Sequence, residues 1–347
     1  MKWSNKIHLS ISLNHNYLYN CIVYLTSLLN NKNKSTFYMI HVLIDNSIKK
    51  ESKIKINKII KKFGEHHVEL KYYNLEGDFK GATTKLFPLS TYYRISLPSI
   101  LPYIDKNIYT DIDVINLADL TEMYNIEFKE KMYFCASLDY NFMINEIKQF
   151  GINITKYINS GILLINLKKI RKDGIEKKIR EFISKYELPF ADQTAINAVC
   201  NNNIQILSYK YGLFAKDTYT ELVNLNANQD KIYRFNESEL KSAYNEPVFF
   251  HYFDWTKPFF KNNCTAYFSR VYWWYYAKMS GFYKNILDFY NFKLNALFAI
   301  SIPLNQVSFP LVKGNEISVR LSFNNWIYIV FLFAYWKKYS FHFVFWN

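Results

Sequence analysis

The sequence predicts an α/β fold in which helices flank a mainly parallel central sheet, with a helical, aromatic and basic region at the C-terminal end. Strand-like and helix-like segments alternate over the first 260 residues, which is typical of parallel strands joined by helices. Half of the 347 residues are apolar, enough for a large core, and only 9 Gly and 8 Pro occur. This composition excludes collagen-like, linker-rich and disordered chains.

The first part of the chain supplies three expected strands separated by two expected helices. The apolar face of the second helix repeats with helical periodicity, whereas the strands are short and apolar. In chain order the segments are strand Ile7–Leu13, helix Tyr17–Leu29, strand Tyr38–Ile44, helix Ser47–Phe63 and strand His67–Tyr73.

The next part continues the alternation and ends in two closely spaced carboxylates. A helix is expected through Thr91–Arg94 to Leu101, followed by a short apolar strand that ends at Thr110 and leads directly into Asp111-Ile112-Asp113. The further expected segments are strands Met132–Ser137 and Tyr157–Leu167, helices from Lys168 and over Ala191–Cys200, and a last strand Val248–Tyr252.

The net charge of +14 predicts an anionic partner, either phosphate groups or a membrane surface. Ten basic and only two acidic side chains follow from Trp255 onward, so much of the excess lies near the C-terminus. No nucleic-acid-binding motif, GxxxxGK[ST] or GxGxxG is present, and nucleic acid is not expected as a partner. Four widely separated cysteines without a CxxC indicate reduced thiols in a cytoplasmic protein.

Asp111 and Asp113 are the central chemical feature of the sequence. Residues i and i+2 of a strand point the same way, and at a strand end two such carboxylates can converge on one hard cation. Open α/β sheets also bind ligands beyond the carboxyl ends of their strands. A single D-x-D also occurs in solvated turns, and by itself it leaves both interpretations open.

Four blocks of this sequence, in this order, resemble the family-8 retaining glycosyltransferases over roughly residues 7–260. The first contains an apolar strand, D-x-D and a following D-L pair, the second an N-S-G turn, the third a D-Q pair before Asn197, and the last H-x-x-x-x-x-K-P-F. The blocks are Leu97–Tyr124, Tyr157–Arg171, Asp192-Gln193, and His251 with Lys257-Pro258-Phe259. The resemblance implies a GT-A-type nucleotide-sugar-binding fold.

The resemblance also implies a metal centre. Asp111, Asp113 and His251 match the family residues that bind a divalent cation, Mn²⁺ or Mg²⁺, which holds the diphosphate of a nucleotide sugar. Two carboxylates and one imidazole suit Mn²⁺ and leave positions for phosphate oxygens. Lys257 matches the lysine that neutralises the departing diphosphate.

Further residues carry over by motif position. Asp139, Asn159, Asp192 and Gln193 match catalytic positions around the reacting sugar, with Gln193 positioning the anomeric centre. The matches to donor-binding positions are Asn14, Asn16, Tyr17, Arg94, Ile112, Gly161 and Lys257.

Three departures from the family pattern concern the donor. Asn14 replaces an Asp that contacts the base, so a carboxylate contact to uracil becomes an amide contact, and UDP remains the expected nucleotide. Asp254 and Trp255 stand in the stretch where the family has a Gly, and Phe259 replaces a Trp.

The expected activity is metal-dependent, retaining transfer of a hexose from a nucleotide sugar, UDP-glucose or UDP-galactose, to a glycan or glycolipid acceptor such as lipopolysaccharide. Two alternatives stay open: a phosphatase-like D-x-D hydrolase, and a catalytically silent membrane-surface binding protein of the same fold. The expected domains are a catalytic domain over 1–260 and a helical, basic, aromatic region over 261–347.

The C-terminal region is expected to meet a membrane surface or the acceptor. Twelve of the 25 residues from Phe323 to Asn347 are aromatic, and the charged ones are Lys337 and Lys338. Aromatic rings favour the headgroup level and lysines an anionic leaflet. The longest apolar stretch, Trp326–Trp336, is too short to span a bilayer. We therefore expect a cytoplasmic protein bound peripherally to the inner face of the cytoplasmic membrane.

Overall fold

A seven-stranded sheet forms the centre of the molecule in the computed structural model, which describes residues 5–64, 66–82, 87–140, 143–214, 218–252, 257–259, 269–290, 299–303 and 326–330. The strand order is β3-β2-β1-β4-β7-β6-β8. These strands are β1 (Asn5–Leu13), β2 (Thr36–Ile44), β3 (Val68–Asn74), β4 (Lys106–Thr110), β6 (Phe134–Ala136), β7 (Ile162–Asn166) and β8 (Ile204–Ile206).

The sheet is mainly parallel, as the sequence predicts, with one inverted strand. β7 runs antiparallel to both of its neighbours, β4 and β6, whereas the other neighbouring pairs are parallel. The alternating residues Ile7, Leu9, Ile11 and Leu13 of β1 are all buried, so the sheet is a core element.

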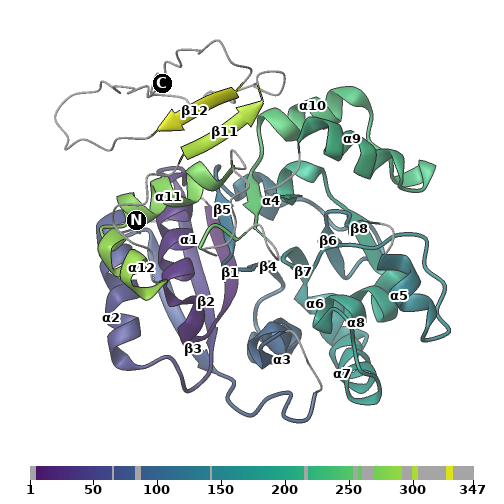
Figure 1. The fold of residues 1–347 in the computed structure, drawn as a ribbon. Coiled ribbons are helices and arrows are strands. Elements are labelled where there is room, and N and C mark those ends of the chain that lie inside the picture. The colour runs from purple at the N-terminus through teal and green to yellow at the C-terminus, as the bar shows by residue number, and fades with distance from the viewer. Residues whose placement is uncertain are drawn as a thin grey trace.

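Helices cover the sheet, and Figure 1 shows α1 and α2 beside the β1–β3 end and α7 and α8 toward the opposite end. The α-helices are α1 (Leu18–Asn30), α2 (Lys50–Ile59), α3 (Leu97–Ile100), α4 (Thr121–Asn125), α5 (Ile144–Lys148), α6 (Leu167–Lys172), α7 (Ile175–Lys185), α8 (Ala191–Cys200), α9 (Tyr219–Ala227), α10 (Glu237–Asn245), α11 (Ser269–Met279) and α12 (Tyr283–Phe289).

Two smaller sheets accompany the central one. The first has the order β5-β10-β9, and the second is the antiparallel pair β11-β12. Their strands are β5 (Val114–Asn116), β9 (Leu213–Phe214), β10 (Phe249–His251), β11 (Ala299–Pro303) and β12 (Trp326–Val330).

Most expected elements are confirmed, and the differences have local causes. The segment that carries Arg94 is a 3₁₀ helix, η3 (Leu89–Ser96), which passes into α3 at Leu97. The strand expected from Tyr157 begins only at Ile162, because residues 159–161 form a turn. The helix expected over Ser47–Phe63 starts at Lys50 and ends in a π turn over Ile60–Gly64.

The C-terminal region is helical where α11 and α12 lie, but it also contains strands that its composition did not predict. β12 falls within the apolar stretch Trp326–Trp336 and pairs with β11, because β-branched and aromatic side chains favour strands. The remainder of the expected membrane-binding segment, residues 323–325 and 331–347, lies outside the described residues.

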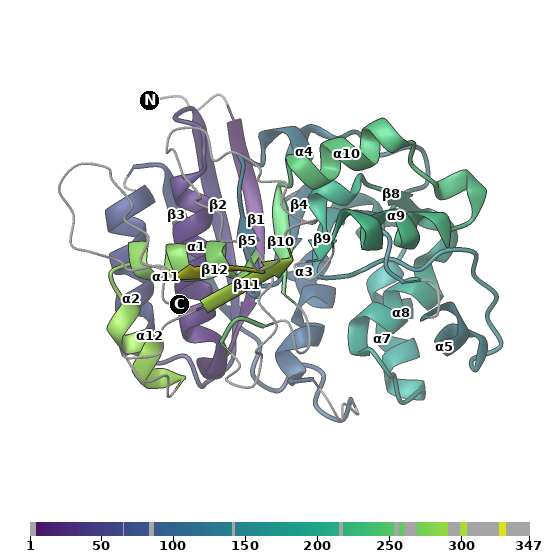
Figure 2. The ribbon, with the colours of Figure 1, turned by 45° about the horizontal axis from the view of Figure 1, so that its top comes forward.

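Helices α11 and α12 share the core of the catalytic part. Trp273, Trp274 and Tyr276 of α11 are buried in the main hydrophobic cluster, and α12 adds Ile286. Figure 2 shows both helices beside α1 and α2. The aromatic run of α11 is therefore packing, while the division of the chain at residue 260 stays a prediction.

Candidate active site

Two carboxylates stand in the turn between β4 and β5. Strand β4 ends at Thr110 and β5 begins at Val114, so Asp111 and Asp113 lie in the connecting turn around buried Ile112. β4 pairs antiparallel with β7, with Thr110 opposite Ile162. This register brings the Asp111 amide within 2.6 Å of the Gly161 carbonyl oxygen, which accepts its hydrogen bond.

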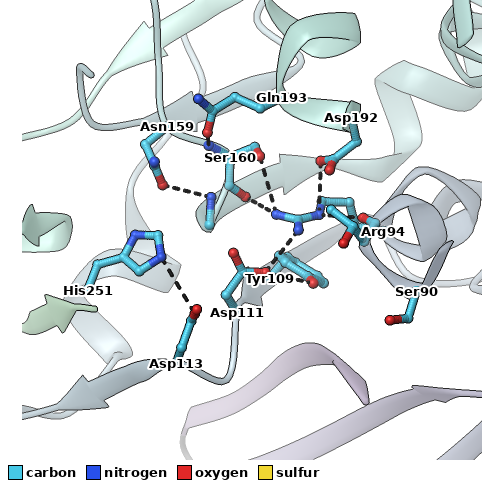
Figure 3. A network of polar contacts seen from close by, with 12 residues as sticks. Ser90, Arg94, Tyr109, Asp111, Asp113, Asn159, Ser160, Asp192, Gln193 and His251 are labelled. Atoms are coloured by element: carbon cyan, nitrogen blue, oxygen red, sulfur yellow. Dashed lines mark hydrogen bonds and ion pairs between the residues drawn. The ribbon is translucent and has the colours of Figure 1, made fainter. Parts of the chain in front are cut away.

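A second strand pairing brings His251 to the carboxylates. β10 runs antiparallel to β5, and His251 lies opposite Val114, the residue after Asp113. The Nε2 atom of buried His251 lies 3.6 Å from Asp113 Oδ1. Figure 3 shows the imidazole facing both carboxylates.

The residues present fit a divalent cation. Asp111, Asp113 and His251 each offer a ligand atom, and these atoms lie within 4.8 Å of one another. Among the described residues, this is the one cluster of three or more potential metal ligands. Two oxygen ligands and one imidazole nitrogen form a donor set suited to Mn²⁺.

Gly161 keeps this space open. A Cβ added there would lie 2.4 Å from His251 Cε1 and 2.8 Å from Asp111 Oδ2. Such distances are far inside van der Waals contact, so a larger residue would displace the carboxylate or the imidazole. Because glycine has no Cβ, the side chains of Asp111 and His251 can approach the backbone closely here.

Arg94 is the buried cation at the centre of the site. Its guanidinium donates to Asp111 Oδ1 at 2.9 Å and lies 3.0 Å from Asp192 Oδ2. It also donates to the Ser160 carbonyl oxygen and stacks over the Tyr109 ring at 4.3 Å (Figure 3). The carboxylate partners of Arg94 thus come from distant parts of the chain and not from the next turn of its own helix.

Burial and this arginine oppose each other at the two carboxylates. Burial raises the pKa of Asp192 to about 7, although Arg94 favours its ionised form and Asp111 opposes it. Burial also raises the pKa of Asp111. Arg94 lowers this pKa, whereas the like charge of Asp113 raises it further. Removing Arg94 would leave buried Asp192 and partly buried Asp111 without their ion pairs, and loss of the partner of a buried charge typically costs about 3–5 kcal/mol.

Lys257 forms an ion pair with Asp113, the second carboxylate of the D-x-D motif. Its Nζ is 3.1 Å from Asp113 Oδ2 and donates to the Tyr17 hydroxyl at 3.3 Å. Burial alone would raise the pKa of Asp113, but Lys257 and His251 lower it below its ordinary value. In turn, Asp113 raises the pKa of Lys257 above its ordinary value despite burial, so both groups are charged at neutral pH.

A hydrogen-bonded network joins three of the four expected catalytic residues, Asp139, Asn159 and Gln193, whereas the fourth, Asp192, pairs with Arg94. Asp139 accepts from Asn159 Nδ2 at 3.0 Å and from Gln193 Nε2 at 3.2 Å. Gln193 Oε1 accepts from the Ser160 amide at 2.9 Å, and Asn159 Oδ1 accepts from the Gly161 amide at the same distance. The Gln193 amide is therefore held at both ends.

The N-terminal donor candidates follow β1. Asn14 Nδ2 donates to Ser90 Oγ at 3.2 Å, which links it to the 3₁₀ helix of Arg94. Asn16 is exposed. Tyr17 joins the site through Lys257, whereas no contact among the described residues links Asn16 to the carboxylates. Asp254 and Trp255 lie outside the described residues.

Three supporting residues were missed from the sequence. Tyr109 donates to Asp111 Oδ1 at 3.1 Å, and its position two residues earlier on the same strand could have indicated this. Ser160 supplies backbone groups to Arg94 and Gln193, and no sequence signal marks them. Buried Gln229 donates from Nε2 to the Asp139 carbonyl oxygen at 3.0 Å, a tertiary contact from the loop after α9.

Comparisons with known proteins show what this chain is similar to. The model of the family described as glycosyl transferase family 8 matches residues 8–263. A Haemophilus influenzae protein is 28% identical over 226 residues, which cover 62% of this chain and 65% of that protein. The lipopolysaccharide 1,2-glucosyltransferase of Escherichia coli is 25% identical over 280 residues, or 76% of this chain and 77% of that enzyme.

A solved structure shows the same fold. The galactosyltransferase LgtC, in complex with donor and acceptor sugar analogues, aligns with a TM-score of 0.64 at 20% identity, over 79% of this chain and 95% of that one. The GT-A-type fold expected from the sequence is thereby confirmed. This chain spans slightly under two thirds of the length of the Haemophilus influenzae relative.

Proposed function

Since this chain belongs to glycosyl transferase family 8, we propose that it transfers a hexose from a nucleotide sugar to a glycan acceptor, with retention at the anomeric carbon and with a divalent cation in the site. The observation that carries the proposal is the convergence of Asp111, Asp113 and His251 from three strand ends within 4.8 Å. Glycosyl transfer to a hydroxyl needs stabilisation of the departing diphosphate, and this cluster lies beside buried Arg94 and partly buried Lys257.

Asp111, Asp113 and His251 are the residues that would hold the cation, and the nature of the ligands favours Mn²⁺ over Mg²⁺. When bound, the cation supplies positive charge against the diphosphate of the donor. Lys257 adds an ammonium on the same side of the site, and its raised pKa keeps it charged through the neutral range.

The remaining residues position these charges and the sugar. Arg94 holds Asp111 and Asp192 in place by ion pairs of 2.9 and 3.0 Å. Asp139 accepts hydrogen bonds from the amides of Asn159 and Gln193 and so fixes the orientation of both side chains. With Gln193 Oε1 engaged by the Ser160 amide, we assign Gln193 a positioning role at the reacting sugar.

For the donor we propose UDP-glucose or UDP-galactose, and for the acceptor lipopolysaccharide or another surface glycan. The names of the relatives support this choice, since one is a lipopolysaccharide glucosyltransferase and another a galactosyltransferase. Asn14 supports a uracil contact, because its amide can hydrogen-bond a pyrimidine edge and its buried Oδ1 has no hydrogen-bond partner among the described residues.

We further propose that the enzyme acts on the inner face of the cytoplasmic membrane, where a glycolipid acceptor would lie. The basic and aromatic composition after Trp255 supports a peripheral contact with anionic lipid. No helix within the described residues is long and apolar enough to cross a bilayer.

A donor screen tests the proposed activity. UDP-glucose, UDP-galactose and their N-acetyl forms are incubated with the full chain, with Mn²⁺ or with chelator, and hydrolysis and transfer are scored. We expect activity with at least one UDP-hexose that depends on Mn²⁺, and a loss of roughly 10²–10³ in rate in Asp113→Asn, since one anionic ligand disappears.

Other outcomes of the screen would contradict the proposal. Cleavage of simple phosphate esters without a sugar preference would favour a phosphatase-like hydrolase. Nucleotide-sugar binding without any turnover would favour a silent binding protein. Full activity of Asp113→Asn in chelator would exclude the metal role.

A further inference from the structure

Each carboxylate of the Asp111–Asp113 pair already forms an ion pair with a cation of the protein. Arg94 lies 2.9 Å from Asp111, and Lys257 lies 3.1 Å from Asp113. The side chains of Lys257 and Asp113 are only 16% and 13% exposed, so this pair is far less screened than a surface pair. These two cations, of which Arg94 is shared with Asp192, offset the negative charge of the ligand set and so weaken its attraction for a divalent cation.

From this charge balance we infer that Lys257 is the resident counter-ion of Asp113, competes with the divalent cation for it, and transfers to the donor diphosphate when nucleotide and metal bind together. The inference rests on the proposed function, because it assumes that a nucleotide diphosphate enters this site. It makes metal affinity depend on the nucleotide through one named side chain.

Arg94 and Lys257 differ in how easily each can move away from its carboxylate. Arg94 is 97% buried and is bound on several sides, by two carboxylates and the Ser160 carbonyl oxygen, with its plane stacked on Tyr109. Lys257 is a compact charge on a flexible stem that also donates to the neutral Tyr17 hydroxyl. A lysine can therefore exchange one anion for another where the planar arginine cannot.

The backbone of this lysine is anchored while its side chain is long enough to move. Phe259, two residues further on, is buried, with its ring stacked on Tyr290 at 4.8 Å and tilted against Trp273 at 5.8 Å. These contacts tie the segment to α11 and to the end of α12. The Lys257 ammonium thus stays within reach of the site in both arrangements.

Thermodynamic linkage gives the inference a measurable form. If Lys257 is paired with Asp113 in the free protein, a metal ion that binds alone must break this ion pair. When the metal ion binds together with a diphosphate, the Lys257 ammonium can pair with the diphosphate instead. Nucleotide then tightens metal binding, and metal tightens nucleotide binding by the same factor. Removing the ammonium should strengthen binding of metal alone and weaken this coupling.

The experiment measures Mn²⁺ binding by the loss of the free-ion EPR signal, with and without UDP, on the full chain. We expect Lys257→Met to bind Mn²⁺ alone about tenfold more tightly than the wild type. The tightening of Mn²⁺ binding by UDP should fall about tenfold in the same variant. Lys257→Arg, which keeps the charge, should stay close to the wild type for Mn²⁺ alone.

Two control variants define the signal. Lys169→Met removes an ion pair of similar geometry, 2.8 Å from Asp173 on α6, and should leave Mn²⁺ binding unchanged. Asp113→Asn should abolish Mn²⁺ binding and so identify the site. Circular dichroism of each variant checks that it is folded.

The outcomes separate the inference from the proposed function. If Lys257→Met binds Mn²⁺ alone no more tightly than the wild type, while Asp113→Asn abolishes binding, the inference is overturned and the metal site stands. If neither the wild type nor Lys257→Met binds Mn²⁺ even with UDP, the metal-dependent function itself is overturned.

Discussion

Gly161→Ala offers the sharpest test of the site, because it adds one methyl group at the point where His251 and Asp111 come closest to the backbone. Its Cβ would lie 2.4 Å from His251 Cε1, whereas ordinary contacts begin at 3.4 Å, so the imidazole must retreat by about 1 Å. Gly161 does not have a positive φ, so the backbone itself accepts alanine without strain.

The expected effects follow from that displacement. A shift of about 1 Å in a ligand can cost roughly 10²-fold in rate, and we expect a loss of that order in kcat for the preferred donor. Mn²⁺ affinity should fall at least tenfold, a loss of about 1.4 kcal/mol or more. Overpacking should lower the free energy of unfolding by only about 1–3 kcal/mol.

Gly174→Ala is the matched control. Gly174 has a φ of 64° at the turn before α7, and no atom of the described residues lies within 4 Å of an added Cβ. Alanine there should lower the free energy of unfolding by roughly 1–2 kcal/mol through backbone strain and leave kcat and Mn²⁺ affinity unchanged. A Gly161→Ala enzyme with wild-type kcat and Mn²⁺ affinity would refute the assignment of this turn to the metal site.

Three other predictions concern the surroundings of the site. Tyr290→Ala should raise the donor KM several-fold because the stack under Phe259 is lost, and steady-state kinetics should show Tyr290→Phe close to the wild type. Burial lowers the pKa of His41 to about 3, so below pH 6.5 the unfolded chain binds a proton that the native chain does not. His8, stacked on His41, has its pKa lowered to about 4 by burial and contributes a loss of the same size. The free energy of unfolding should therefore fall by about 2.8 kcal/mol at pH 5.5, and urea titrations at pH 5.5 and 7.5 should show about half of this loss in His41→Gln. Deleting residues 331–347, which leaves β12 in place, should release the protein from anionic vesicles in a sedimentation assay while donor hydrolysis persists; undiminished vesicle binding would exclude this segment as the anchor.

Local features of the chain could be predicted from the sequence because they depend on backbone periodicity. The strand before Asp111, the helix Ala191–Cys200 and the alternation of the first 260 residues follow from short apolar patterns. A spacing of two residues at a strand end likewise predicts that Asp111 and Asp113 converge. His251 and Lys257 were found through family motifs, and their motif positions carry no information on distance.

The tertiary structure alone decided which of these groups touch. His251 meets Asp113 because β10 pairs with β5 in one particular register, and a slip of one residue would turn the imidazole to the other face. Register, the inverted strand β7 and the strand pair β11–β12 depend on contacts between segments far apart in the chain. The charge balance at the carboxylates has the same origin, since Arg94 and Lys257 reach them from a 3₁₀ helix and from a segment anchored by α11. Local patterns determine the direction of side chains along an element, whereas the packing of whole elements determines their partners.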